Sequence, residues 1–388
     1  MHLGIYIHFP YCLSKCPYCD FASRAEAVIP QERYTEAVLR ELRARAAQFA
    51  EPSREVVSIY FGGGTPSLWD PSQVGRVLAA CRDLFDVREG AEITLEANPG
   101  TTDEGRFTAF RKLGVNRLSI GVQSFADSQL LVLGRKHSAS EAERAFRTAR
   151  AAGFDNVSLD LIHGGSGHTV EAAARDAASA VALGPEHISA YALTLTGLAE
   201  DVPMAKAVRR GEVVLPSDDE QAAMGEAVRS ELARGGYARY EISNFARPGF
   251  EAVHNSLYWR GVEYVAAGCG ACGFLRMRDG AILARRYMND RSPERYLERV
   301  EQTGLGEASF EEVDREQHLR ERIFTGLRLS EGIDLRVLEE DLGSAILSRF
   351  ACVIDRLVRE ELAVLEGTHL RLTDRGLDLH SEVAVRFF

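Results

Sequence analysis

Three cysteines near the start of the chain are the residues whose type and spacing point most directly to chemistry. Cys12, Cys16 and Cys19 fall within eight residues at the end of the stretch GIYIHFPYCLSKCPYCDFA. A structural zinc takes four protein ligands, and an ordinary iron–sulfur cluster is held by four cysteines. A CxxxCxxC segment therefore leaves one metal position open to a ligand from outside the protein. By spacing alone, the segment could also be half of a zinc site or three free thiols.

The segments around the cysteines indicate an α/β fold. Residues 4–9 read as a short buried strand, so the cysteines lie in the loop at its carboxyl end. Further strands are predicted at 56–61, 92–97, 117–122, 156–162 and 187–194, each followed by a helical pattern. Strands that alternate with helices form parallel sheets, and barrels of this kind carry their active sites at the carboxyl ends of the strands. We therefore predict a partial (β/α)6 barrel, open on one side.

Three units are expected along the chain, because the pattern changes beyond residue 200. Residues 1–200 form the partial barrel, and residues 201–310 form a connecting segment that covers it, with a short strand at 240–244. Residues 311–388 contain three helical patterns, two short strands and a closing helix, which is typical of a small winged-helix-like domain. At 388 residues, the chain is long enough for a barrel and a smaller second domain.

Composition argues against several classes of function. The formal net charge of −11 disfavours general binding of nucleic acid, because affinity for phosphate backbones rests on Lys and Arg. No run of about 18 apolar residues could span a bilayer. The first residues, MHLGIYIHF, enter the first strand at once without a signal or transit peptide, so we expect a cytoplasmic protein. Seven cysteines, mostly clustered, suit a reducing compartment in which thiolates bind metal.

The cysteine segment, with Tyr18 just before its third cysteine, resembles the radical S-adenosylmethionine (SAM) superfamily. The resemblance implies that Cys12, Cys16 and Cys19 hold a 4Fe–4S cluster. It also implies that the fourth iron is chelated by SAM, which an electron from the cluster cleaves to a 5'-deoxyadenosyl radical. A GGGTP segment follows the second predicted strand, and in the family it meets the amino group of SAM. The resemblance therefore assigns Gly63, Gly64 and Thr65 to SAM.

Polar residues at the predicted strand ends extend the resemblance. They fall at or beyond the carboxyl ends of strands three to five, where barrel active sites assemble. Singly, each could be a polar group satisfied within the barrel. Jointly with two tyrosines they are similar to the SAM-contacting positions of the porphyrin-linked branch, the coproporphyrinogen dehydrogenase and HemW group. The residues concerned are Tyr6, Tyr18, Glu96, Gln123, Arg135 and Asp160.

The stretch HNSLYW, which begins at His254, resembles the HNxxYW motif of the HemW family of haem-binding proteins. Histidine is a common axial ligand of haem iron, and Tyr258 and Trp259 offer flat apolar surface to a porphyrin. All three are candidate haem contacts. The alternative is that this segment only caps the open side of the barrel.

A second pair of cysteines, Cys269 and Cys272, lies in the glycine-rich segment GCGACG. The pair is either two small residues in a turn or a source of thiolate for haem iron or a second metal. Where HemW proteins have GCGAHG, Cys272 replaces the histidine. The chain also departs from the family at 163–169, where HGGSGHT stands in place of HGLPGQT, and at 195–197.

Three functions remain open on this resemblance. The favoured one is a HemW-like protein that keeps the cluster and the SAM site, binds haem and delivers it to an acceptor protein. A reductant such as flavodoxin or ferredoxin is then an expected partner. The alternatives are a HemN-like SAM-dependent methyltransferase or cyclopropanase, and oxygen-independent coproporphyrinogen decarboxylation. The dehydrogenases carry an arm before the first strand and a further cysteine where this chain has Phe21, so that activity is not expected.

Overall fold

The computed structural model describes residues 2–48, 54–101, 103–195, 202–277, 282–342 and 345–388. Within these ranges, one sheet of twelve strands runs in the order β14-β13-β12-β11-β1-β4-β5-β6-β7-β8-β10-β9. Its middle part, from β11 to β8, is parallel. The parallel strands are β1 (His2–Phe9), β4 (Glu55–Gly63), β5 (Asp86–Ala97), β6 (Arg117–Gln123), β7 (Val157–His163), β8 (His187–Ala192) and β11 (Tyr264–Ala267).

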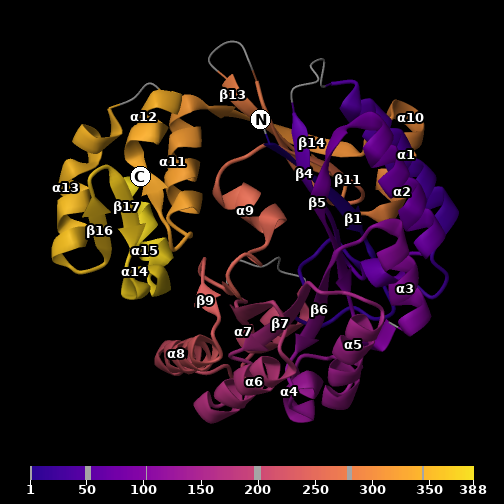
Figure 1. Cartoon of the computed structure of the whole chain (residues 1–388), viewed down its shortest axis with the longest axis horizontal. Helices are drawn as coiled ribbons and strands as arrows, with labels where there is room; N and C mark the ends of the chain where they lie inside the picture. Colours follow the sequence, from indigo (N-terminus) through magenta and orange to yellow (C-terminus); the bar gives the residue numbers. More distant parts are fainter. Residues whose placement is uncertain (1, 49–53, 102, 196–201, 278–281, 343–344) are drawn as a thin grey trace.

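Helices cover the outer face of this sheet and give it the predicted form of a partial barrel (Figure 1). The expected alternation of strand and helix is present from β1 to β8. The second helix matches its predicted range of about 71–84, whereas the first and third, predicted over 31–49 and 102–113, are shorter. Residue 49 and Thr102, included in predicted helices, lie outside the described residues. The covering helices are α1 (Gln31–Ala46), α2 (Pro71–Leu84), α3 (Glu104–Leu113), α4 (Asp127–Val132), α5 (Ala139–Ala151) and α6 (Val170–Leu183).

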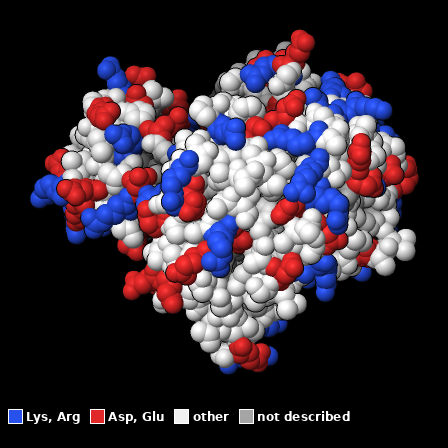
Figure 2. All heavy atoms as spheres, turned by 60° about the horizontal axis from the view of Figure 1, so that its bottom comes forward, with Lys and Arg blue, Asp and Glu red and all other residues white. Residues whose placement is uncertain are grey.

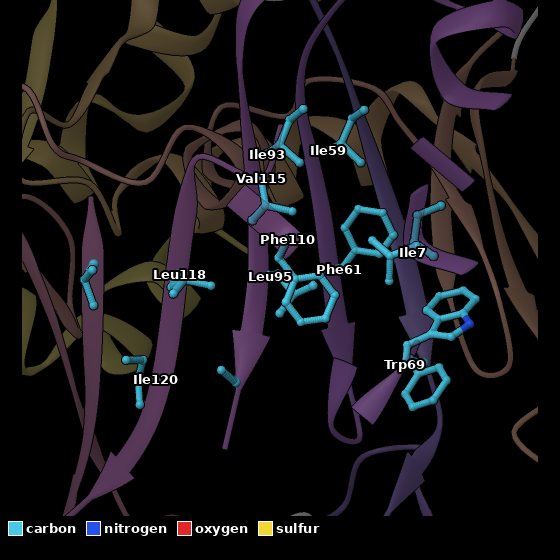
Figure 3. Packing of buried hydrophobic residues seen from close by; sticks show 14 of the residues in the cluster. Ile7, Ile59, Phe61, Trp69, Ile93, Leu95, Phe110, Val115, Leu118 and Ile120 are labelled. Atoms are coloured by element: carbon cyan, nitrogen blue, oxygen red, sulfur yellow. The ribbon is translucent and has the colours of Figure 1, made fainter. Parts of the chain in front are cut away.

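The alternating residues of the strands explain why the helices pack there. In β6, Leu118, Ile120 and Val122 are fully buried in the outer apolar core. The same holds for Ile59 and Phe61 of β4 (Figure 3). Successive side chains of a strand point to opposite faces, so the residues between these face the inside of the barrel.

The segment from 202 to 314 contributes more of the sheet than its sequence pattern indicated. It adds a parallel strand and three antiparallel strands beside β1, and two short strands beside β8. The limit expected at 310/311 falls within β14, and the division into three units stays a prediction. The added elements are α7 (Pro203–Arg209), α8 (Asp218–Arg234), β9 (Ala238–Arg239), β10 (Asn244–Ala246), α9 (Val253–Trp259), β12 (Cys272–Arg276), β13 (Ile282–Asn289), α10 (Pro293–Thr303) and β14 (Glu307–Asp314).

The strand expected at 240–244 was wrong, because most of that stretch forms a turn between β9 and β10. The Glu241 carboxylate accepts hydrogen bonds from the Ser243 amide at 2.8 Å and from the Asn244 side chain at 2.6 Å. Such local bonds offer the backbone an alternative to a strand ladder. Arg328 of the C-terminal domain also donates to Glu241, at 2.9 Å.

The C-terminal residues form a small domain with its own apolar core, beside the barrel in Figure 1. Its three-stranded sheet has the order β15-β17-β16, and its helices pack against that sheet. The order of helices and strands agrees with the winged-helix-like pattern. The elements are α11 (Arg315–Gly326), β15 (Ile333–Asp334), α12 (Leu335–Leu342), α13 (Ile346–Arg359), β16 (Ala363–Glu366), β17 (His369–Leu372), α14 (Asp374–Asp378) and α15 (His380–Ala384).

The surface carries charges of both signs. On the face shown in Figure 2, Lys and Arg side chains are interspersed with Asp and Glu around a broad area of uncharged residues. Within the described ranges, no helix is long and apolar enough to cross a membrane.

A buried carboxylate on α1 joins the barrel to the added strands. Glu41 is fully buried and pairs with Arg45, one helical turn later, at 3.4 Å. It also accepts hydrogen bonds from the Gly268 amide at 3.0 Å and from the side chains of Asn289 and Tyr296 at 2.9 and 2.8 Å. Burial raises the pKa of Glu41, and these donors oppose that effect. Groups from α1, α10, β13 and the loop after β11 thus meet at one side chain.

Glu41→Ala should lower the free energy of unfolding by about 3–5 kcal/mol, because it removes one partner of a buried ion pair. Urea unfolding followed by circular dichroism measures this loss. Glu36→Ala is the matched control, since Glu36 lies on the same helix but pairs with Arg76 in solvent and should matter little. Equal losses in the two variants would contradict the role assigned to Glu41.

Candidate functional site

A cavity of about 280 Å³ lies at the carboxyl ends of the parallel strands, and we call it the cysteine cavity. Its size is near the lower end of the range of roughly 300–1,000 Å³ that is usual for ligand pockets. All three cysteines of the CxxxCxxC segment line it, together with most of the predicted SAM-contacting residues. These residues are Cys12, Cys16, Cys19, Tyr18, Gly63, Gly64, Thr65, Glu96, Gln123, Arg135 and Asp160.

Each of the three thiols has a polar neighbour. The Thr65 hydroxyl donates to Cys12 Sγ at 3.4 Å, and the Arg135 guanidinium donates to Cys16 Sγ at 3.6 Å. Cys19 Sγ lies 3.9 Å from the hydroxyl of Ser23. Donors beside sulfur stabilise thiolates and tune the clusters they hold.

The thiols are not gathered around a single point. In the described part of the chain, no three His, Cys, Asp or Glu side chains are close enough to hold one metal ion. A 4Fe–4S cubane makes no such demand, because each cysteine binds a different iron. The donor set therefore fits three corners of a cubane better than a mononuclear zinc site.

The GGGTP segment lines the cavity next to the cysteine loop. Gly63 has a φ of +117°, and a Cβ there would lie 2.5 Å from the His8 ring. A Cβ on Gly64 would lie 2.8 Å from the carbonyl oxygen of Tyr11. Both positions therefore require glycine, and both residues line the cavity.

Glu96, at the end of β5, is held against this segment by two donors. Its carboxylate accepts hydrogen bonds from the Tyr60 hydroxyl at 2.8 Å and from the Gly63 amide at 3.0 Å. Burial raises the pKa of Glu96 to about 7, and the nearby Asp160 carboxylate adds to the rise while the two donors oppose it. A cationic ligand in the cavity would favour the ionised form.

Gln123 ends β6, Arg135 follows α4, and Asp160 lies in the middle of β7 and not at its end as predicted. Gln123 ends β6 with a φ of +67°, which is uncommon for a residue other than glycine and is typical of functional sites. Arg135 donates to the Gly121 carbonyl at 2.9 Å in addition to its contact with sulfur. Asp160 accepts hydrogen bonds from the Ser119 hydroxyl at 3.0 and 3.1 Å. The predicted residues are thus brought together on one wall.

A second, larger cavity of about 650 Å³ adjoins the first, and we call it the tyrosine cavity. Tyr6, which the resemblance assigned to SAM, lines this cavity and not the cysteine cavity. The two candidate cysteines of GCGACG differ in their surroundings. Cys272 lines the tyrosine cavity, whereas Cys269 is fully buried and lines neither cavity.

The HNSLYW stretch forms α9, a short helix between the barrel and the C-terminal domain (Figure 1). Its amino end is held by Glu92 of β5, which accepts hydrogen bonds from the amides of Val253 and His254 at 3.0 Å each. Acidic groups are favourable at this end of a helix. Arg117 lies 3.9 Å from the same carboxylate.

The three haem candidates of this stretch have different surroundings. His254 is buried, and its ring nitrogens contact the hydroxyls of Ser58 at 2.9 Å and Tyr258 at 2.7 Å. Burial, reinforced by Arg117, lowers the pKa of His254 to about 3, so the ring is neutral. Tyr258 lines the tyrosine cavity. Trp259 lines neither cavity, and Arg328 of the C-terminal domain stacks on its ring at 4.2 Å.

Comparison with known proteins shows what this chain is related to. It is 36% identical to the heme chaperone HemW of Haemophilus influenzae over 96% of this chain and 94% of that protein. It is also 40% identical to the heme chaperone HemW of Escherichia coli over 80% of each chain. The chain belongs to the HemW family.

Family models and a solved structure agree with this relationship. The model of the radical SAM superfamily matches residues 6–178, and the model of the HemN C-terminal domain matches residues 313–379. The structure of coproporphyrinogen III oxidase (HemN) from Escherichia coli has a TM-score of 0.82 with 22% identity, and covers 99% of this chain and 89% of that one. At that identity, the likeness shows the fold. The radical SAM fold therefore surrounds the cysteine cavity.

Several residues that line the cysteine cavity were missed by sequence analysis. They come from inward-facing strand positions, from the residue directly after β5 and from α9. A signal was available, because polar residues alternate with buried apolar ones in RLSIGVQ and VSLDLIH. The missed residues are Tyr60, Asn98, Arg117, Ser119, Ser189, Tyr191 and Asn255.

Proposed function

We propose that this chain binds haem and passes it to an acceptor protein, using a radical SAM fold that also holds a 4Fe–4S cluster and SAM. The observation that carries the proposal is similarity to two proteins named heme chaperone HemW, in one case over 96% of this chain. The free thiols of the described cysteines suit a reducing compartment, so the cytoplasm remains our expected location.

The cysteine cavity supports the cofactor part of the proposal. Cys12, Cys16 and Cys19 would each bind one iron of the cluster, with Thr65 and Arg135 as donors to two of the thiolates. The reduced cluster, when bound, supplies an electron that cleaves SAM. Gly63 and Gly64 line the cavity where the methionine part of SAM would lie, and Glu96 offers its carboxylate to a positive group. A flavodoxin or ferredoxin is the kind of reductant that this chemistry requires.

Activity as a coproporphyrinogen dehydrogenase is not part of the proposal. Phe21 stands where the resemblance places a further cysteine in those enzymes, and it is 61% exposed at the border of the two cavities. The methyltransferase or cyclopropanase reading rested on the unusual segments 163–169 and 195–197. Thr196 and Gly197 lie outside the described residues.

Replacing Cys12, Cys16 and Cys19 together by Ala should abolish the cluster. Anaerobically reconstituted wild-type protein should contain about four irons per chain, as a cubane requires. Iron analysis and the visible absorption of the cluster measure the change. Cys81→Ala is the control, because Cys81 is buried in α2 away from the cavity. Retention of the cluster by the triple variant would refute the assignment.

Glu96→Ala should weaken SAM binding about tenfold or more, because losing a charge-assisted hydrogen bond costs roughly 1.5–3 kcal/mol. Since the pKa of Glu96 is raised to about 7, protons compete with the cationic groups of SAM below that pH. Affinity in the wild type should therefore fall about tenfold from pH 8 to pH 6. Calorimetry measures both effects, and Glu104→Ala, an exposed change on α3, serves as control. If the Glu96→Gln variant keeps the wild-type pH dependence of SAM binding, Glu96 is not the group that causes it.

The purified protein should bind one haem per chain in a titration followed at the Soret band. The same preparation, reduced and incubated anaerobically with SAM and coproporphyrinogen, should form no protoporphyrinogen. If haem fails to bind and SAM is converted to S-adenosylhomocysteine with a methylated product, the methyltransferase alternative is correct instead.

A further inference from the structure

The tyrosine cavity is a second ligand-sized space, and it lies beside the cysteine cavity that would hold the cluster. At about 650 Å³, it is more than twice the volume of the cysteine cavity and in the middle of the usual range for ligand pockets. The two cavities have common walls, since Tyr18, Cys19, Phe21, Ile162 and Tyr191 line both. A ligand in the larger cavity would therefore lie next to the cluster.

The walls of this cavity are chiefly aromatic. Tyr6, Tyr18, Tyr191, Tyr258 and Tyr264 line it from β1, the cysteine loop, β8, α9 and β11. Aromatic rings give apolar faces for a large flat ligand, and tyrosine adds a polar edge through its hydroxyl. A planar tetrapyrrole has this combination of flat apolar faces and polar edges.

The cavity also offers one group suited to iron and one suited to a carboxylate. Cys272, at the start of β12, is half-buried in the wall, and thiolate is one of the ligands that hold haem iron. Arg291 lines the same cavity with a half-exposed side chain that pairs with Asp20 at 3.6 Å, and a guanidinium can bind a further carboxylate with its remaining N–H groups. Haem carries two propionates.

We propose that the tyrosine cavity is the haem site, with Cys272 as the axial ligand from the protein and Arg291 bound to a propionate. This proposal rests on the proposed haem-binding function and adds its location and ligand. It places haem beside the cluster, with Tyr258 of the HNSLYW stretch against the macrocycle.

The other thiol and imidazole groups near the cavity are already occupied. The His8 ring contacts the Tyr6 hydroxyl at 3.0 Å and the Ala22 carbonyl at 2.9 Å. His254 contacts two hydroxyls, as described above, and Cys19 belongs to the CxxxCxxC segment. Burial raises the pKa of the Cys272 thiol and Arg286 opposes this rise, and binding to iron would deprotonate the thiol. Cys272 is thus the group best placed to reach iron.

The test is a comparison of haem binding by wild type, Cys272→Ala and Cys269→Ala, each reconstituted with its cluster. Wild type should give the absorption and electron paramagnetic resonance spectra of thiolate-ligated ferric haem. Cys272→Ala should lose these spectra and bind haem about tenfold or more weakly, since even groups behind a metal ligand are worth about 10–100-fold in affinity. Cys269→Ala, which changes a buried cysteine outside the cavity, should leave both unchanged.

A conservative replacement separates ligation from packing. Cys272→His should restore the affinity for haem and change the spectrum to that of an imidazole ligand. If Cys272 had a purely structural role, neither effect would be seen. Arg291→Ala should weaken binding of haem but not of haem dimethyl ester, which lacks free carboxylates. Iron analysis of each variant checks that the cluster is intact.

The outcomes distinguish the two proposals. If wild type binds no haem, the proposed function itself fails. If wild type binds haem and Cys272→Ala keeps the same spectrum and affinity, the function stands and the site assigned here is wrong. If Arg291→Ala binds haem as tightly as the wild type, only the assignment of the propionate contact is wrong.

Discussion

The inside of the barrel is polar, and every charge placed there must be compensated. Arg117 of β6 and Glu92 of β5 are both nearly fully buried and lie 3.9 Å apart. An uncompensated charge buried at this depth would strongly destabilise the fold. The residues packed around Arg117 and Glu92 must therefore leave the contact between the two intact. The Glu92 carboxylate also accepts hydrogen bonds from the first two amides of α9. The position of the HNSLYW helix therefore depends on a charge pair within the sheet.

This arrangement links segments that are far apart in the sequence. β5 anchors α9, and α9 in turn contacts the C-terminal domain through Trp259 and Arg328. Arg260, directly after the helix, pairs with Glu331 at 2.9 Å. The small domain is thus attached beside the wall of the two cavities. It has an apolar core of its own, and Ile242 and Leu283 of the preceding segment pack against that core.

The predicted barrel strands were recognisable because their outward residues form regular apolar patterns, as in β6. The cysteine cavity was predictable for a different reason, since CxxxCxxC and GGGTP are local motifs. The strands added beside β1 could not be predicted in this way. The first of them, β11, has only four residues and leads into a glycine-rich turn. Nor could the spacing of Cys269 and Cys272 predict which of them lines a cavity, because their surroundings depend on where β12 begins. Long-range contacts also decided the turn at Glu241, which Arg328 helps to hold.

The short helix α9 has a consequence for genetics. Within two turns it supports the sheet through His254, borders one cavity with Asn255 and the other with Tyr258, and holds the C-terminal domain through Trp259. A loss-of-function allele in this helix therefore does not identify a ligand of iron. The same phenotype would arise from a displaced wall or a detached domain. Only alleles that separate these defects, such as changes confined to the cavity surface, carry information about binding.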